Sequence, residues 1–335
     1  MPPTLEHLAR RYIPGRGPVT IDRLGSGLVN QSYRVGREAR VFSLRLTAPR
    51  AAELGLDRHW ECRVLACAAA AGLAPAVERC EPRAGILVSC WAEGSVWNAE
   101  QAGAAETLDT VAQLARRVHL LPLLERARIV SVGQWIAFYR RSLERAGGAQ
   151  SDGSADRPPA SLDAAANCLV DALSQEPRPA LALCHSDLHV QNLVITARGA
   201  PLILDWEYAH VSDPLWDLAG WICNGDLARA QCDLLLCLYL QREPTREEAL
   251  RLARLAWLYD YVCLLWSELY LSSPSTVGAA RDAVSMRAQC LTKRLAARFT
   301  EGLADGLAEG LADGLADGIA EALAATGRAG QVPAH

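Results

Sequence analysis

Carboxylate and amide side chains lie at the ends of two apolar segments near the middle of the chain. The segment CHSDLHVQNLVI (184–195) places Asp187 and Asn192 in a polar loop, and the apolar run of LILDWEYA (202–209) ends at Asp205. An apolar strand that leads directly into Asp is an unusual place for a charge, because a buried charge is costly unless it is paired or bound to a metal. Phosphoryl transfer needs this combination: one carboxylate accepts the proton of an acceptor hydroxyl, and an amide oxygen and a second carboxylate hold Mg²⁺ against a triphosphate. The pattern therefore favours a phosphoryl-transfer site.

The same loop admits two other interpretations. His185, Asp187 and His189 form an H-x-D-x-H pattern, and alternation along an extended strand would place all three on one side, as in a hydrolytic metal site. Asp, Asn and His are also common in plain turns, because their side chains hydrogen-bond to nearby backbone. The hydrolytic interpretation leaves Asn192, Asp205 and Glu207 unexplained, and the sequence has no further His cluster. Phosphoryl transfer is the preferred hypothesis, and the other two stay open.

The loop and the strand that follows it resemble the H-x-D-x-x-x-x-N and D-x-E elements of the aminoglycoside phosphotransferase and choline kinase superfamily. The stretch DWEYAHVSDPLWDLA (205–219) is most similar to the choline/ethanolamine kinase and thiamine kinase branch, in which Glu follows the metal-binding Asp by two positions. The resemblance implies that Asp187 is the catalytic base and that Asn192 and Asp205 bind Mg²⁺. It also implies that Glu207 supports the metal.

Two more residues have supporting roles by the same resemblance. His185 would hydrogen-bond within the loop as a structural residue, and Asp217, in PLWDLA, would brace the catalytic loop. The resemblance spans roughly residues 20–275 and is more specific at 184–219 than at 24–61.

A glycine-containing turn lies between two predicted strands near the N-terminus, in LGSGLVNQSYRV (24–35). Glycine lets the backbone approach phosphates closely, and exposed N–H groups can bind phosphate oxygens. A plain β-turn would look the same, but the segment resembles the G-x-x-N-x-x-Y phosphate loop of the choline and thiamine kinases. The resemblance implies that Gly25, Ser26, Gly27 and Asn30 lie over the triphosphate of ATP.

A cationic residue is expected on the strand VFSLRL (41–46), where the superfamily commonly has lysine and sometimes arginine. Arg45 occupies that position, and a guanidinium offers bidentate geometry to phosphate oxygens and to a carboxylate. Its expected partner is Glu61 on the following helix, and its expected catalytic role is to neutralise charge on the leaving side. The alternatives are an exposed cation on an edge strand and a glutamate on a solvated helix face.

Aromatic side chains suggest a pocket for the acceptor. The helix predicted at 252–271 places Trp257 and Tyr261 on one face as i, i+4 neighbours, and Trp206 and Trp221 could complete a wall. Aromatic faces bind quaternary ammonium groups well, although large aromatic residues are commonly part of the core. Both interpretations stay open. The hypothesis for the acceptor is an amino alcohol such as choline or ethanolamine, with thiamine and an aminoglycoside as alternatives.

The composition is that of an ordinary globular protein, with 335 residues, 50% of them hydrophobic, 21% charged, and a net charge of -4. The sequence has no basic stripe with interleaved aromatics, so we expect no nucleic-acid partner. It has no apolar run suited to a signal peptide or a membrane span. Its 11 cysteines include no C-x-x-C pair, so we expect neither a disulfide framework nor a zinc site, but small buried hydrophobes in a reducing, cytoplasmic compartment.

Hydrophobic patterning predicts an α+β chain, and the resemblance implies a bilobal protein-kinase-like fold. Residues 1–92 are predicted to form a small β-rich nucleotide-binding lobe, and residues 93–299 a larger helical lobe with the catalytic and acceptor-binding segments. Residues 300–335 repeat a Gly-Leu-Ala-Asp unit, in which each interior Gly costs roughly 0.8–1 kcal/mol of helix stability. This tail is predicted to be a marginal helix that has either no function or a role in self-association.

These features together predict a small-molecule kinase that uses ATP and Mg²⁺ to phosphorylate a hydroxylated acceptor. Two hypotheses from other classes stay open. The chain could be a kinase-like protein that binds nucleotide without turnover, or an interaction protein that assembles through its repeat tail.

Overall fold

The chain forms two compact units. The computed structural model describes residues 4–147, 158–197, 199–304 and 306–307. One unit is made of residues 1–128 with 182–211, and the other of residues 129–181 with 212–335. Within the first unit, β6 (Gly94–Val96) pairs with β8 (Leu193–Thr196), and the lobe boundary at residue 92 stays a prediction. The predicted α+β class is confirmed.

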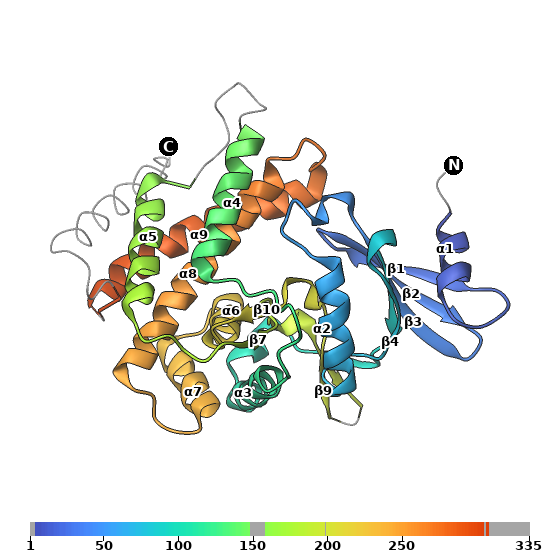
Figure 1. The fold of residues 1–335 in the computed structure, drawn as a ribbon, viewed down its shortest axis with the longest axis horizontal. Coiled ribbons are helices and arrows are strands. Elements are labelled where there is room, and N and C mark those ends of the chain that lie inside the picture. The colour runs from blue at the N-terminus through green and yellow to red at the C-terminus, as the bar shows by residue number, and fades with distance from the viewer. Residues whose placement is uncertain (1–3, 148–157, 198, 305, 308–335) are drawn as a thin grey trace, which may run out of the picture. The chain divides into compact units, whose positions relative to one another are not determined.

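An antiparallel sheet forms the N-terminal part of the first unit (Figure 1). Its strand order within the described residues is β1-β2-β3-β5-β4, with β1 Thr20–Ser26, β2 Asn30–Arg37, β3 Arg40–Thr47, β4 Val77–Glu81 and β5 Ile86–Cys90. Because side chains alternate along a strand, Phe42 and Leu44 of β3 enter a core that also contains Ala9, from helix α1 (Leu5–Tyr12). Arg45, the next residue of β3, points to the opposite face.

Helix α2 (Arg58–Ala70) lies on the other side of this sheet from α1 (Figure 1). Asp57 is its N-cap and accepts hydrogen bonds from the backbone N–H groups of His59 and Trp60, both at 3.0 Å, which satisfies donors that the first turn leaves without helical partners. The Trp60 indole donates to the Ala209 carbonyl at 2.7 Å. The cap and the indole contact together set the position of Glu61 on the buried face of the helix.

Short strands carry the segments that contain Asp187 and Asp205. β7 (Ala182–Cys184) pairs with β10 (His210–Ser212), and β6, β8 and β9 (Pro201–Ile203) form a further sheet. The Leu204 N–H donates to the Asn192 carbonyl at 2.8 Å, so the polar loop and the strand end that leads to Asp205 lie side by side. The unit also contains α3 (Ala105–His119) and the 3₁₀ turns η1 (Pro49–Ala51), η2 (Pro82–Ala84), η3 (Ala99–Gly103), η4 (Val190–Asn192) and η5 (Trp206–Tyr208).

The second unit is helical in its described residues. Its helices are α4 (Val132–Gly147), α5 (Ala160–Gln175), α6 (Leu215–Gly225), α7 (Arg229–Leu240), α8 (Arg246–Leu271) and α9 (Gly278–Ala304). Helix α8 packs against α4, α5, α6 and α9. Its buried Asp260 accepts hydrogen bonds from Arg294 and Arg298 of α9, because a buried carboxylate needs charged partners.

No helix among the described residues is long and apolar enough to cross a membrane. Residues 305 and 308–335, which hold most of the Gly-Leu-Ala-Asp repeat, lie outside the described residues. The predicted self-association through this tail therefore stays a prediction.

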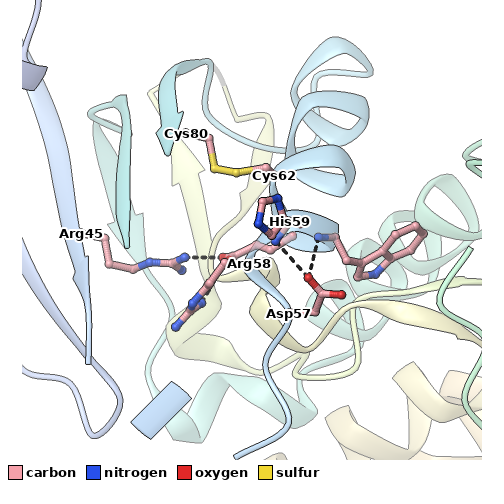
Figure 2. The surroundings of a disulfide bond; sticks show 8 residues. Arg45, Asp57, Arg58, His59, Cys62 and Cys80 are labelled. Carbon is pink, nitrogen blue, oxygen red and sulfur yellow. Dashed lines mark hydrogen bonds and ion pairs between the residues drawn. A yellow bond between two sulfur atoms is a disulfide. The ribbon is translucent and has the colours of Figure 1, made fainter. Parts of the chain in front are cut away.

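The expectation that the cysteines are small buried hydrophobes is wrong for one pair, which forms a disulfide. Cys62 of α2 and Cys80 of β4 form a disulfide with their Cα atoms 6.0 Å apart (Figure 2), and the other nine cysteines, all within the described residues, carry thiols. Contact between α2 and β4 brings together two residues that are 18 positions apart. The spacing of cysteines in the sequence carries no sign of this pairing, because it depends on how a helix packs against a strand.

Candidate active site

The turn between β1 and β2 carries the predicted phosphate loop. A Cβ at Gly27 would lie 2.7 Å from the backbone oxygen of Asn30, so only glycine fits there without a shift. Asn30 begins β2 and is buried, and its Nδ2 donates to Glu207 Oε2 at 2.6 Å. The end of the loop is therefore tied to the predicted metal-supporting residue. Phosphate binding by Gly25, Ser26, Gly27 and Asn30 stays a prediction.

Arg45 lies among the acidic residues of the first unit. Its Nη1 donates to Asp205 Oδ1 at 2.8 Å, and its Nη2 donates to Glu61 Oε1. The Oε2 atom of Glu207 lies 3.9 Å from Nη1. The Arg45 side chain is 11% exposed, and charge-assisted hydrogen bonds are strong in such a low-dielectric setting. The predicted ion pair with Glu61 is present, and the alternative of an exposed edge-strand cation does not hold.

Arg58 is a second cation of the site that the sequence analysis missed. It is the first residue of α2, and its Nη1 donates to Glu61 Oε2 and to Glu207 Oε2, both at 2.8 Å. Its Nη2 donates to Asn30 Oδ1 at 2.7 Å. The spacing of Arg58 and Glu61 could have indicated their contact, because residues three apart on a helix are neighbours. The contacts with Glu207 and Asn30 have no local signal.

Asp205 has a left-handed backbone conformation, with φ at 56°. Non-glycine residues adopt this conformation at a cost and are found in it at functional sites. Ser186, which precedes Asp187, also has a positive φ, of 69°. Both predicted acidic segments therefore contain a strained residue next to or at the acid itself.

Burial disfavours the ionised form of the Asp205 and Glu207 carboxylates. Burial raises the pKa of Glu207 to about 7, and the Asp205 charge adds to this while Arg45 and Arg58 oppose it. The pKa of Asp205 is raised in the same way by removal from water, although its side chain still has an exposed fraction of 37%. Burial disfavours the charge of Arg45, but Glu61, Asp205 and Glu207 outweigh it and raise the pKa of Arg45 above its ordinary value. A further cation at this site would relieve the carboxylates.

Asp187 lies in the polar loop with a side chain that is 31% exposed. The Nδ2 of Asn192 donates to the Asp187 carbonyl at 2.9 Å and to Asp187 Oδ2 at 3.3 Å, which leaves the Asn192 amide oxygen as the atom that can bind a metal. His189 Nε2 lies 3.6 Å from Asp187 Oδ2. This arrangement holds the carboxylate in place while leaving it accessible to an acceptor.

His185 has the structural place that the sequence analysis predicted. It is buried, its Nδ1 accepts from the Asp187 N–H at 3.3 Å, and its Nε2 therefore carries the proton and donates to the Leu204 carbonyl at 2.8 Å. Because both ring nitrogens have backbone partners, His185 is not available to bind a metal together with Asp187 and His189. The hydrolytic metal site of the H-x-D-x-H interpretation would therefore lack His185 as a ligand.

The donor set of the site fits Mg²⁺. Carboxylate oxygens of Glu61, Asp205 and Glu207 lie within 4.8 Å of one another, and Mg²⁺ prefers oxygen ligands. Three carboxylates face two guanidinium groups, Arg45 and Arg58, so the fully ionised group has one net negative charge that a metal would balance. The backbone of the predicted ligand Asn192 is hydrogen-bonded to Leu204, the residue before Asp205.

The four aromatic residues considered for an acceptor pocket or for the core are buried, which favours the core interpretation, and a role in acceptor binding stays a prediction. Trp206 and Tyr261 are 0% exposed, Trp221 1% and Trp257 2%. Trp206 donates from its indole to the Ile203 carbonyl, and Trp257 does so to Leu295. The Trp257 and Tyr261 rings stack at 5.8 Å, so the predicted i, i+4 contact is present but faces the interior. Asp217 is buried on α6 of the second unit, and its bracing role stays a prediction.

An α+β chain whose strand-borne arginine faces the acids of two later segments falls in the class of protein-kinase-like small-molecule phosphotransferases. Comparison with known families agrees, because residues 20–263 match the phosphotransferase enzyme family, APH. The chain belongs to this family, which confirms the superfamily that the motifs at 184–219 indicated.

Solved structures show the same fold. A choline/ethanolamine kinase family protein from Mesorhizobium loti is 25% identical with a TM-score of 0.68, and the match covers 90% of this chain and 95% of that one. Choline kinase LicA from Streptococcus pneumoniae, which is also known in complex with AMP, is 20% identical with a TM-score of 0.70, and the match covers 88% of this chain and 98% of that one. Macrolide 2'-phosphotransferase MphH from Brachybacterium faecium is 17% identical with a TM-score of 0.56, and the match covers 85% of this chain and 97% of that one. The comparison with curated proteins gave no match.

Proposed function

We propose that this phosphotransferase is an ATP- and Mg²⁺-dependent kinase whose acceptor is the hydroxyl group of a cationic amino alcohol of the choline or ethanolamine type. The observation that carries the proposal is the contact of Arg45 with both Glu61 and Asp205, in the unit that also contains the Asp187–Asn192 contact. Positioning and charge stabilisation are the main requirements of phosphoryl transfer, and these residues supply both.

In the proposed reaction, Asp187 accepts the proton of the acceptor hydroxyl as the acceptor oxygen bonds to the γ-phosphorus. The bond between that phosphorus and the bridging oxygen of ADP breaks, and the electron pair leaves with ADP. The hydrogen bond from Asn192 keeps the Asp187 carboxylate oriented, and Arg45 neutralises charge on the leaving side. Asp205 and Asn192, supported by Glu207, would hold Mg²⁺, which supplies further charge neutralisation on the phosphates.

The acceptor class is the finer part of the proposal. It is supported by the choline/ethanolamine kinase family protein at 25% identity, and by TM-scores of 0.68 for that protein and 0.70 for choline kinase LicA, against 0.56 for the macrolide enzyme. Thiamine and an aminoglycoside are the alternative acceptors. Use of a nucleotide is supported by the AMP complex of LicA.

The test is Mg²⁺-dependent turnover of ATP by the purified chain with choline, ethanolamine, thiamine, kanamycin and simple sugars offered in parallel. Asp187→Ala should abolish acceptor-stimulated turnover. Asp22→Ala, an exposed acid on β1 of the same unit, should leave it unchanged. Turnover with thiamine or kanamycin alone would refute the amino-alcohol proposal, and nucleotide binding without any turnover would favour the non-catalytic hypothesis.

A further inference from the structure

Arg45 and Arg58 form ion pairs with different sets of acidic residues in the site. Glu61 accepts from Arg45 at Oε1 and from Arg58 at Oε2. Glu207 Oε2 is 2.8 Å from Arg58 Nη1 but 3.9 Å from Arg45 Nη1. Arg45 therefore has Asp205, rather than Glu207, as its second close partner. Glu207 is therefore paired more closely with Arg58 than with Arg45.

Arg58 also closes a triangle with the phosphate loop. Arg58 donates a hydrogen bond to Asn30 Oδ1, and Asn30 Nδ2 donates one to Glu207 Oε2. Glu207 Oε2 also accepts a hydrogen bond from Arg58. Glu207 and Asn30 are 149 and 28 residues from Arg58 along the chain. The Arg58 side chain is 11% exposed, so these bonds are largely protected from solvent screening.

We propose that Arg58 is a positioning residue for nucleotide binding, which holds the end of the phosphate loop and Glu207 together and keeps Arg45 directed to Asp205. This inference rests on the proposed kinase function. In this role Arg58 acts through the side chains that it bonds, Asn30, Glu207 and Glu61.

Loss of Arg58 should change nucleotide and metal binding in opposite directions. Without its charge, Glu207 loses its closest cation and can turn toward Arg45, which draws that guanidinium away from the phosphates. Nucleotide affinity should therefore fall. The same loss removes a positive charge from beside the acids, so that Mg²⁺ should bind more tightly. A residue with a purely structural role would weaken both.

The experiment compares Arg58→Met, which keeps the aliphatic stem, with the parent protein by calorimetric titration with ADP and with a non-hydrolysable ATP analogue in the presence of Mg²⁺. We expect nucleotide affinity to fall roughly 10- to 100-fold, as for the loss of charge-assisted hydrogen bonds. We also expect half-saturation at a lower Mg²⁺ concentration at fixed ATP analogue. Arg58→Lys should restore part of the loss, because an ammonium is a point charge without the planar fork that binds Glu207 and Asn30 together.

Arg63→Met is the matched control, because Arg63 is an exposed arginine of the same helix that donates to the Glu125 carbonyl. A second readout needs no ligand: urea unfolding of Arg58→Met, Asn30→Ala and the double variant should give non-additive losses of stability, since the two side chains share a bond. Additive losses, or a nucleotide affinity of Arg58→Met equal to that of the parent, would overturn the inference.

The outcomes also separate this inference from the proposed function. If the parent binds nucleotide but turns over no acceptor, the acceptor proposal fails and the binding comparison still decides the role of Arg58. If the parent binds no nucleotide at all, both proposals fall. If Arg58→Met weakens nucleotide and Mg²⁺ binding alike and in proportion to its lost stability, Arg58 has a structural role only.

Discussion

The Cys62–Cys80 disulfide should contribute substantially to the stability of the first unit. The two cysteines are 18 positions apart, and a cross-link of that span removes loop entropy worth about 3 kcal/mol from the unfolded chain. The pair joins α2 to β4 (Figure 2), and both side chains are half-buried, so that Cys62→Ala with Cys80→Ala should add little cavity cost. For a unit of this size, the expected fall in the unfolding temperature is roughly 6–12 °C.

The assay has two parts. Thiol titration of the unfolded chain should find nine thiols without reductant and eleven with it, since nine of the 11 cysteines carry thiols. Calorimetry should then show the lower transition for the double variant without reductant. Cys67→Ala, on the same helix and half-buried, is the matched control. The reduced and oxidised forms of this variant should still differ in unfolding temperature. Eleven thiols without reductant, or an unchanged transition in the double variant, would refute the reasoning.

Three more outcomes follow from the buried charges. Arg45→Met should lower nucleotide affinity about 100-fold in calorimetry, because it removes a cation that bonds two acids. Arg45→Lys should recover part of this affinity. Equal nucleotide affinities of Arg45→Met and the parent protein would contradict the prediction. Burial raises the pKa of Glu207 to about 7, and a bound cation favours the ionised form. Binding of Mg²⁺ with nucleotide near pH 7 should therefore release a proton, seen as a buffer-dependent enthalpy that Glu207→Gln removes. Asp260→Asn should destabilise the second unit by about 3 kcal/mol in urea unfolding, since Arg294 and Arg298 lose their shared carboxylate; an unchanged midpoint would show that solvent already screens these arginines.

Local rules were sufficient to predict the position of Arg45. Alternation along β3 places Phe42 and Leu44 in the core and turns Arg45 to the other face. The helix that follows supplies Glu61 on its buried face, which is the partner that the sequence indicated. The polar loop was predictable for a similar reason, because an apolar strand that ends in Asp is costly without a compensating partner.

Helical spacing alone does not distinguish aromatic residues that line a pocket from aromatic residues in the core. The i, i+4 rule correctly placed Trp257 beside Tyr261, but it does not say which face of α8 meets other helices. Here Leu295 of α9 accepts the Trp257 indole N–H, and Arg140 of α4 donates to the Tyr261 hydroxyl. Packing partners from distant segments decide the matter, and no pattern within 252–271 contains them.

Arg58 shows how a broken local rule can point to a site. The first turn of a helix favours acidic side chains, because the unpaired N–H groups and the helix dipole place partial positive charge there. An arginine at the first position of α2 is therefore locally unfavourable, and so is its burial. Glu61, and above all Glu207 from 149 residues away, offset both costs. Conflicts between local preference and tertiary structure are expected where function requires them, so a buried cation at a helix start is a sequence feature worth testing for distant acidic partners.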